Sequence, residues 1–351
     1  VSWQRLAIGT PGTSLTMNEA GTLPHWGYCF GGDSYGYMHG GTIPYAIAGN
    51  LSTYTDIIEK FAFATDSNAT DVGNLNEGRG YLGGFHSTTH GYAISGQRGN
   101  YWDPANWNGT KNIHKYSYAS DADATFVGDA VSPVGDDDRM CSGFVNSSNS
   151  MGYAAAYETA NQTIQKISTV TDGNAVASAG TLHTGISAAA SACSASHGYI
   201  AGGHSGPTPT NIIQKFSFVT DSNGTDVGDL TQVKSHNDAG ASSCTHGYTM
   251  GGGNTGPTHD TDKIEKWSFA TDANSTDIGN LTTGKGWGAG QSSKTHGYFS
   301  GGGYPAPGPN NIPLALPATS DAIEKFPFAS DSDATDSGDL TMARFGGAGT
   351  E

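Results

Sequence analysis

Hydrophobic and polar residues alternate in short stretches along this chain, and the same succession of stretches returns six times. In the last full unit it comprises small residues at 281–293, THGYFSGG at 295–302, AIEKFPF at 322–328 and the turn ASDSDATD, which leads into a short segment ending in Gly-Asp-Leu. Alternating segments bounded by Gly-rich and Asp-rich turns predict β-strands. Each unit therefore predicts four strands, which form one antiparallel blade.

The register of the repeat is tight. A Gly-Tyr step falls at Tyr28, Tyr92, Tyr153, Tyr199, Tyr248 and Tyr298, and an Ile-x-Lys step follows at Lys60, Lys115, Lys166, Lys215, Lys266 and Lys325. A period of about 50 residues holding several short strands is typical of a propeller blade. The sequence therefore predicts an all-β, six-bladed β-propeller with four-stranded antiparallel blades.

Ring closure is predicted from the two ends of the chain. Residues 340–351 have the pattern of a first strand, whereas HWGYCFGG at 25–32 reads as a second strand. Pairing of these segments would leave no open sheet edge, because the C-terminal strand would complete the N-terminal blade. In the alternative, Leu15-Thr16-Met17 supplies the first strand of that blade.

The units resemble the kelch repeat. In one unit the resemblance rests on Arg79, Gly83-Gly84 and Gly91-Tyr92, and in another on Gly198-Tyr199, Gly202-Gly203 and Phe216. The kelch tryptophan is absent, since Val72, Val227 or Ile278 takes its place. The resemblance thus implies a kelch-like propeller that is only remotely related.

Short sequence strings within the repeat also resemble those of the repetitive virion structural proteins of marine cyanophages. The shared strings are His246-Gly247-Tyr248, Ile264-Glu265-Lys266-Trp267 and the segment from Asp66 to Leu75. This resemblance implies a place on a virion or in the extracellular space, with other virion or assembly proteins as partners.

We expect a single domain, because repeats that bury their faces against neighbours can run on as one unit. Residues 1–22 are interpreted as an N-terminal extension or tether, and residues 23–351 as the propeller. The chain begins at Val1, which suggests processing or a longer parent protein. The expected blades are 340–351 with 23–75, then 76–130, 131–182, 183–230, 231–281 and 282–339.

The six lysines are predicted to form structural ion pairs, because a lone buried ammonium group is costly. Their expected partners are the equally regular aspartates of the following turns, in the same or the adjacent blade. These are Asp66, Asp121, Asp172, Asp221, Asp272 and Asp331. A residue that returns six times is not expected to be catalytic.

The composition narrows the range of functions. A formal charge of −16 makes nucleic acid an unfavourable ligand, and no apolar run predicts membrane insertion. The four cysteines have no zinc spacing and are expected to be buried thiols rather than disulfides. No nucleophile triad, Walker loop or metalloprotease motif occurs, so we expect neither an enzyme nor a required cofactor.

Two repeated polar features have a functional and a structural interpretation. His90, His197, His246 and His296 precede the Gly-Tyr step and either line a channel or satisfy local backbone groups. Asp66, Asn68 and Asp71 have the oxygen spacing of a calcium loop but lack its glycine and its distal glutamate. Asx-turns explain the same residues, so we expect no metal in the first place and calcium as the weaker alternative.

Loop length is the main difference between the units. The stretch from tyrosine to lysine is longest in the sixth, first and second repeats, which are neighbours in a closed ring. Their loops predict one continuous patch that could bind a glycan or a protein, or that could pack as caps. The predicted ligand-binding aromatics are Tyr35, Tyr37, Tyr45, Tyr54, Tyr101, Trp102, Trp107 and Tyr304.

Three functions remain open from the sequence. The first is a non-enzymatic binding propeller, a phage tail, fibre or decoration component that recognises a host-surface glycan or receptor through this patch. The second is a purely structural assembly propeller within a virion or extracellular complex. The third, a secreted kelch-like enzyme, has no residue cluster to support it.

Overall fold

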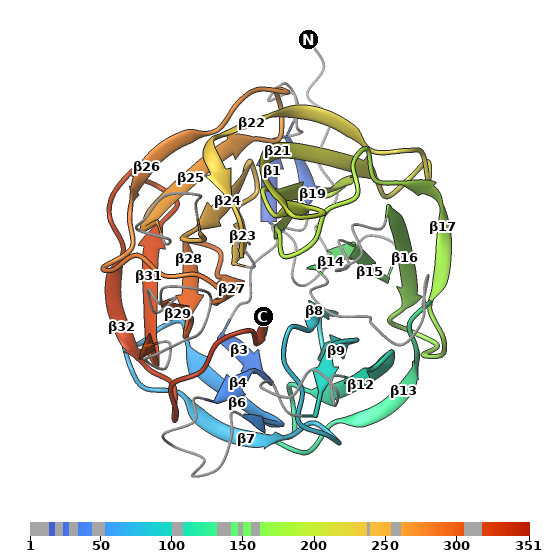
Figure 1. Ribbon diagram of the computed structural model, residues 1–351, viewed down its shortest axis with the longest axis vertical. Coiled ribbons are helices and arrows are strands. Elements are labelled where there is room, and N and C mark those ends of the chain that lie inside the picture. The colour runs from blue at the N-terminus through green and yellow to red at the C-terminus, as the bar shows by residue number, and fades with distance from the viewer. Residues whose placement is uncertain are drawn as a thin grey trace.

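Six antiparallel sheets stand in a ring around a central axis, as the computed structural model shows (Figure 1). The structure describes residues 14–17, 24–27, 34–43, 53–99, 108–131, 142–146, 150–155, 162–236, 239–253, 261–304 and 318–351. Each sheet has four strands ordered from the axis outward, and one carries an additional short strand. The fold is therefore an all-β, six-bladed propeller, as the repeat predicts.

The first three blades follow the chain order. Blade 1 contains β33 (Ala348–Thr350), β3 (Tyr35–His39), β6 (Ile57–Ala62) and β7 (Thr70–Asn74). Blade 2 contains β8 (Gly83–His86), β9 (His90–Ile94), β12 (Asn112–Ser117) and β13 (Thr125–Asp129). Blade 3 contains β14 (Ser142–Asn146), β15 (Met151–Ala155), β16 (Thr163–Ser168) and β17 (Val176–Thr181).

The remaining blades complete the ring. Blade 4 contains β18 (Ala190–Cys193), β19 (His197–Ala201), β21 (Thr208–Ser217) and β22 (Thr225–Lys234). Blade 5 contains β23 (Gly240–Ser242), β24 (His246–Met250), β25 (Lys263–Ser268) and β26 (Thr276–Asn280). Blade 6 contains β27 (Ala289–Ser292), β28 (His296–Ser300), β31 (Ala322–Pro327) and β32 (Thr335–Asp339).

The C-terminal strand closes the ring, but its partner is not the segment expected from the sequence. β33 pairs with β3, with Tyr37 opposite Thr350, and Tyr37 in turn lies opposite Lys60. The Gly-Tyr step of the first blade is therefore Gly36-Tyr37, and the assignment to Tyr28 is wrong. β2 (Pro24–Gly27) pairs instead with β1 (Ser14–Met17) in a separate two-stranded sheet, which also rules out the alternative closure.

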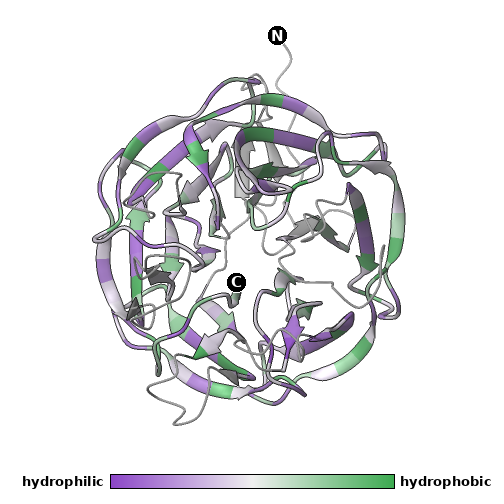
Figure 2. Cartoon of the chain, in the orientation of Figure 1, coloured by the Kyte–Doolittle hydropathy of each residue, from purple (hydrophilic) through white to green (hydrophobic). Residues whose placement is uncertain are grey.

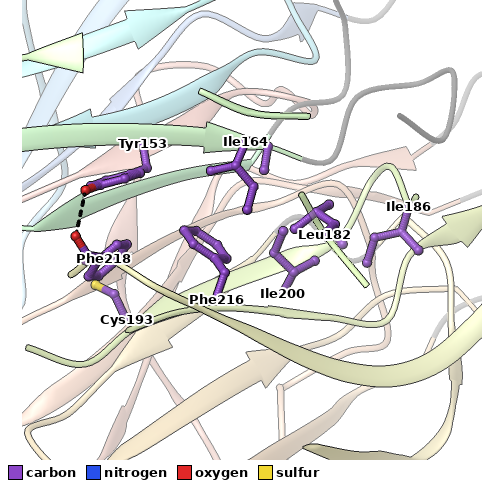
Figure 3. Packing of buried hydrophobic residues seen from close by; sticks show 10 residues of the cluster. Tyr153, Ile164, Leu182, Ile186, Cys193, Ile200, Phe216 and Phe218 are labelled. Atoms are coloured by element: carbon purple, nitrogen blue, oxygen red, sulfur yellow. Dashed lines mark hydrogen bonds between the residues drawn. The ribbon is translucent and has the colours of Figure 1, made fainter. Parts of the chain in front are cut away.

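The repeated tyrosine locks each blade onto the next one. Tyr37, Tyr153, Tyr199, Tyr248 and Tyr298 lie 4.6 to 4.8 Å, ring centre to ring centre, from an aromatic residue of the following blade. Figure 3 shows one such contact, where the Tyr153 hydroxyl also donates to the carbonyl oxygen of Phe218. Aromatic pairs of this kind add about 0.5 to 1.5 kcal/mol each beyond the area that they bury.

The glycine before each tyrosine exists for packing. A Cβ atom on Gly91 would lie 2.3 Å from the Tyr116 ring, and one on Gly198 would lie 2.4 Å from the Phe216 ring. In five blades the aromatic residue after the lysine fills the space that the missing side chain leaves, and in blade 3, where Ile167 follows Lys166, Phe85 fills it. This explains why Gly-Tyr is written as a pair in the repeat.

In blades 1, 5 and 6 the residue before the repeated lysine is a buried glutamate, and a buried cation neutralises it. Glu59 pairs with Arg344, Glu265 with Lys234 and Glu324 with Lys285, and all six side chains are at most 1% exposed. In blade 4 the carboxylate is replaced by Gln214 and the cation by Ile186, and both are buried. Blade 2 keeps the cation, Arg79, opposite His114, and there the guanidinium group donates to the carbonyl oxygens of Ser95 and Asn112.

Candidate functional site

Within the described residues, one end of the ring carries four additional hairpins, each between the second and third strands of a blade, and we call this end the loop face. The hairpins are β4 (Thr42–Ile43) with β5 (Thr53–Tyr54), β10 (Gln97–Arg98) with β11 (Asn108–Gly109), β20 (His204–Ser205) with the start of β21, and β29 (Gly303–Tyr304) with β30 (Ala318–Thr319). Each stem consists of two residue pairs. Glycines at positive φ, such as Gly301 and Gly302 at +69° and +95°, turn the chain from the second strand into the stem.

The stems are alike, whereas their tips differ in length. In blade 4 the tip is residues 206–207, while in blades 1, 2 and 6 it comprises residues 44–52, 99–107 and 305–317. A single bridge fixes each stem to the segment that enters its own blade, for example Ser187 opposite His204 and Gly286 opposite Gly303. The fold thus presents variable tips on a constant base.

Aromatic rings from several blades follow one another on the loop face, and we call this row the aromatic arc. The ring centres are 4.9 Å apart for His204 and His236, 4.2 Å for His236 and Trp287, 5.6 Å for Trp287 and Phe345, and 6.2 Å for Phe345 and Tyr81. Tyr54 packs against the same cluster as Tyr81 and Phe345. The arc therefore runs across blades 4, 5, 6, 1 and 2.

Strained backbone carries part of the arc. His236, Trp287 and Tyr81 have φ values of 51°, 54° and 54°, and Gly346 occupies the corresponding place in blade 1. Trp287 N–H donates to the carbonyl of His236, Gly346 N–H to that of Trp287, and Tyr81 N–H to that of Gly346. Left-handed backbone at a non-glycine residue costs about 1 kcal/mol or more. The contacts with neighbouring blades must therefore stabilise this part of the aromatic arc.

The predicted loop patch is corrected by the structure. Tyr37 lies within β3 and is 2% exposed, because it is the repeated inter-blade tyrosine of blade 1. Tyr35 begins the same strand, at the end away from the loop face, where the Lys60 ammonium group lies 5.0 Å from its ring centre. Tyr54 is on the loop face but buried, and Tyr304 lies in β29. Tyr45, Tyr101, Trp102 and Trp107 lie outside the described residues.

Glycines close the central channel because the first strands meet there. A Cβ atom on Gly143 would lie 1.9 Å from the Gly84 carbonyl oxygen, and one on Gly290 would lie 2.0 Å from that of Gly240. Gly349 has the same close contact with Gly290, and Ser191 holds the corresponding position in blade 4. Cavities of about 40 and 70 Å³ both include this ring of small residues in their linings, and each continues toward a different end of the first strands.

The larger cavity holds polar side chains that the sequence analysis did not single out. They are the last residues of first strands or the residue just after, namely His86, Cys193, Ser242, Ser292 and Glu351. Cys193 N–H donates to Ser242 Oγ and Ser242 N–H to Ser292 Oγ, each at 2.9 Å. A signal was present in the sequence, since His86, Cys193, Ser242 and Ser292 each directly precede the serine that begins the turn to the next strand.

Burial disfavours the charged forms of the His86 and Glu351 side chains in this cavity. Desolvation lowers the pKa of His86 to about 4 and raises the pKa of Glu351 to about 8, against a backbone hydrogen bond from Ser292. The imidazole is then unprotonated and the carboxyl group mostly protonated. The described residues hold no group of three or more His, Cys, Asp or Glu side chains suited to a metal ion.

The six repeated lysines each pair with an aspartate of the next blade. The pairs are Lys60–Asp121, Lys115–Asp172, Lys166–Asp221, Lys215–Asp272, Lys266–Asp331 and Lys325–Asp66. The lysine side chains are 18 to 25% exposed, so these pairs are half-buried rather than deeply buried. The Lys325–Asp66 pair bridges the two ends of the chain and repeats the closure made by β33.

The side-chain oxygens of the calcium-like turn make structural contacts. Asp66 pairs with Lys325, Asn68 Oδ1 accepts from the backbone N–H of Asp339, and Asp71 Oδ1 accepts from that of Gly73. The oxygens thus address three separate partners. The contact of Asn68 recurs at Asn174, Asn223 and Asn274, so this turn also fastens each blade to the preceding one.

The four histidines take up local contacts. Nδ1 of His90, His246 and His296 lies 2.8, 2.8 and 2.9 Å from the hydroxyl oxygen of the preceding threonine, and His197 has the same contact with Ser196. They begin second strands, and none of them lines the two cavities. Desolvation lowers the pKa values of His90, His246 and His296.

Two further features bear on the expectations from composition. Cys244 is disulfide-bonded, which corrects the expectation of a thiol at that position, and Cys193 is buried. The part of the chain that the structure describes contains no helix long and apolar enough to cross a membrane.

The six sheets in a ring make this protein a six-bladed β-propeller, and the hairpins of different length give it one variable face. No protein-family model matches the chain, and no curated protein matches it significantly. The kelch and cyanophage resemblances therefore rest on the repeat strings alone.

Proposed function

We propose that this protein is a non-enzymatic binding propeller, a component of a phage virion that recognises a host-surface glycan or receptor through its loop face. The observation that carries the proposal is the contrast between identical stems and variable tips. Features that the fold requires, such as the Lys–Asp pairs and the stacked tyrosines, recur around the ring, whereas the hairpin tips range from 2 residues in blade 4 to 13 in blade 6. Variable loops on a rigid scaffold are the usual place for recognition.

The sequence of the tips supports binding. The tip 99–107 reads GNYWDPANW and the tip 44–52 reads PYAIAGNLS, so they combine aromatic residues with Asn, Asp and Gly. Flat aromatic rings stack on sugars and are enriched in protein hot spots, while amide groups supply hydrogen bonds. The aromatic arc on the same face supplies a rigid, packed base for the hairpin stems. The resemblance of the repeat strings to cyanophage virion proteins favours a cyanobacterial surface as the target.

The test exchanges tips without touching the stems. Residues 99–107 are replaced by the Gly-Pro turn of residues 206–207, since both stems are two-pair hairpins. We expect unchanged thermal unfolding and a loss of binding to a glycan array or to marine cyanobacterial cells. The matched control replaces residues 206–207 by Gly-Asn and should retain binding.

The point variants Trp102→Ala and Trp107→Ala should each weaken binding by about 1 kcal/mol or more. Wild-type protein that binds neither cells nor glycans would leave the structural assembly role as the better explanation. The same holds if the tip exchange has no effect on binding.

A further inference from the structure

One position on the outer strand is acidic in four blades and apolar in two. Asp71, Asp226, Asp277 and Asp336 occupy the same register position on the outer strands of blades 1, 4, 5 and 6. Phe126 and Ala177 hold that position in blades 2 and 3. Phe126 is 52% exposed, and its ring lies edge-on to His114 with the ring centres 6.4 Å apart.

Large exposed hydrophobic side chains gather in the same part of the rim. Among the described residues, four of the five lie in adjacent blades: Phe126 in blade 2, Val170 and Val176 in blade 3, and Val219 in blade 4. The fifth is Tyr35 of blade 1. Val170 and Val219 stand in the turn after the third strand, where the other four blades have Ala64, Ala119, Ala270 and Ala329. The bias is therefore local and does not belong to the repeat.

These side chains lie on elements that follow one another around the circumference. The blade 3 turn docks on β13 of blade 2, because Asp172 pairs with Lys115 at 2.9 Å and Gly173 N–H donates to the Val127 carbonyl. The blade 4 turn docks on β17 in the same way, through Asp221 with Lys166 and with Ser178. We call the exposed side chains of Phe126, Val170, Val176, Ala177 and Val219 on these elements the neutral sector. Figure 2 shows green and pale segments along β13 and β17.

Charge is also absent along β17 and the chain that follows it into blade 4. Residues 173–214 contain no Asp, Glu, Lys or Arg, in a protein whose formal charge is −16. Lys166 and Asp221 at its border are paired with each other. Two copies of such an acidic protein repel one another over most of their surface, but not where two neutral sectors meet. The two turns do carry Asp172 and Asp221, but each is paired with a lysine, and Asp129 lies at the far end of β13.

We propose that the neutral sector is the interface with a second copy of this chain, in a two-fold symmetric dimer. A two-fold interface places the same patch on both partners, and the neutral sector is a surface that can face itself without opposing like charges. The contact uses the rim, so it is separate from the loop face and does not depend on the proposed recognition function.

Sedimentation velocity over the micromolar range tests the proposal on the whole chain. The variant Phe126→Asp with Ala177→Asp restores the residue that four other blades carry, so the scaffold accommodates it. We expect wild-type dimers, and at least about tenfold weaker self-association in the variant. Added salt should strengthen the wild-type dimer, because it screens the repulsion between the acidic copies.

The matched control is Asp336→Ala, at the same strand position in blade 6 and outside the sector, which should leave the dimer unchanged. Thermal unfolding verifies that all variants fold. A wild-type protein that stays monomeric at every concentration and salt level overturns the proposal. A dimer that resists the double variant, or one that Asp336→Ala weakens equally, overturns it as well.

Discussion

At the scale of single residues, charge compensation governs the interior. Glu265 accepts hydrogen bonds from the Thr231 backbone N–H and the Ser275 hydroxyl while it pairs with Lys234. Burial alone would raise the pKa of Glu265, but Lys234, Ser275 and Thr231 outweigh it and hold the pKa below its ordinary value. Blade 4 shows that an amide can do the same work, because Gln214 accepts from Thr184 N–H and donates to its carbonyl.

Replacement of Lys234 by Ile should lower the free energy of unfolding by about 3 to 5 kcal/mol, because it leaves a buried carboxylate without its partner. Adding Glu265→Gln should recover most of this loss, since the pair then matches Gln214 and Ile186 of blade 4. Denaturant unfolding of the two single variants and the double variant measures the coupling. Equal stability of Lys234→Ile and the double variant would show that the charges are not coupled.

Buried histidines should make the fold sensitive to acid. Desolvation, with a contribution from Arg79, lowers the pKa of His114 to about 4, so the folded protein keeps this ring neutral. Below the ordinary histidine value of about 6.5 the unfolded chain binds a proton that the folded chain refuses. Stability therefore falls as the pH drops from about 6.5 to about 4, by at most about 1.4 kcal/mol per pH unit for each such group.

His114→Gln should reduce this acid slope, because Gln165 and Gln214 fill the corresponding position in blades 3 and 4. The measurement is the free energy of unfolding between pH 4 and pH 7, a range set by these two pKa values. His183→Gln is the control, since that side chain is exposed in the folded protein. An unchanged slope in His114→Gln would mean that other groups, such as His39 and His236, dominate the acid response.

At the scale of elements, the positions of the strands follow from the sequence, but their register and the exact bounds of the first strand do not. The segment AIEKFPF is β31 almost in full, and THGYFSGG contains β28. The expected first strand at 281–293 shortens to Ala289–Ser292, because Lys285 enters the core and Trp287 adopts left-handed backbone. Local alternation cannot reveal these two events, since both depend on neighbouring blades.

The register of the first blade was ambiguous for a physical reason. Gly27-Tyr28 and Gly36-Tyr37 are both followed by Gly-Gly, so both fit the local pattern. Only the spacing to the lysine separates them, because Tyr37 to Lys60 equals Tyr92 to Lys115. The aromatic arc cannot be recognised from the sequence for a similar reason. Its members come from five blades and become neighbours only when the ring forms.

Gly290→Ala should destabilise the protein by at least about 3 kcal/mol, because the new methyl group would meet the backbone of β23, which has no freedom to yield. Ser191→Ala is the matched control at the same ring position in blade 4, where a Cβ atom already fits. Chemical unfolding of both variants decides the matter. A Gly290→Ala protein as stable as Ser191→Ala would show that the channel can widen.

At the scale of the whole molecule, closure is reinforced by contacts between distant parts of the chain. β33 completes blade 1, Lys325 pairs with Asp66, Arg344 pairs with Glu59, and the Asp339 N–H donates to Asn68. Each of these joins the last blade or the C-terminal segment to the first blade. The ring therefore behaves as one cooperative unit rather than as six independent sheets.

Deletion of residues 348–351 should lower the melting temperature of the entire ring in a single transition, since it exposes the inner edge of β3. The released edge should also promote aggregation. Calorimetry and light scattering measure the two effects. A truncated protein with an unchanged melting temperature, or one in which only blade 1 unfolds first, would argue against cooperative closure.

The place of β33 has a consequence for biosynthesis. A ribosome releases blades 2 to 5 before it has made the strand that completes blade 1, so the nascent chain carries an unfinished first sheet until β33 emerges. A chain that stops before residue 348 has an open edge, whereas one that includes β33 can close the ring. The order of synthesis thereby makes ring closure depend on a strand that is made after the other five blades.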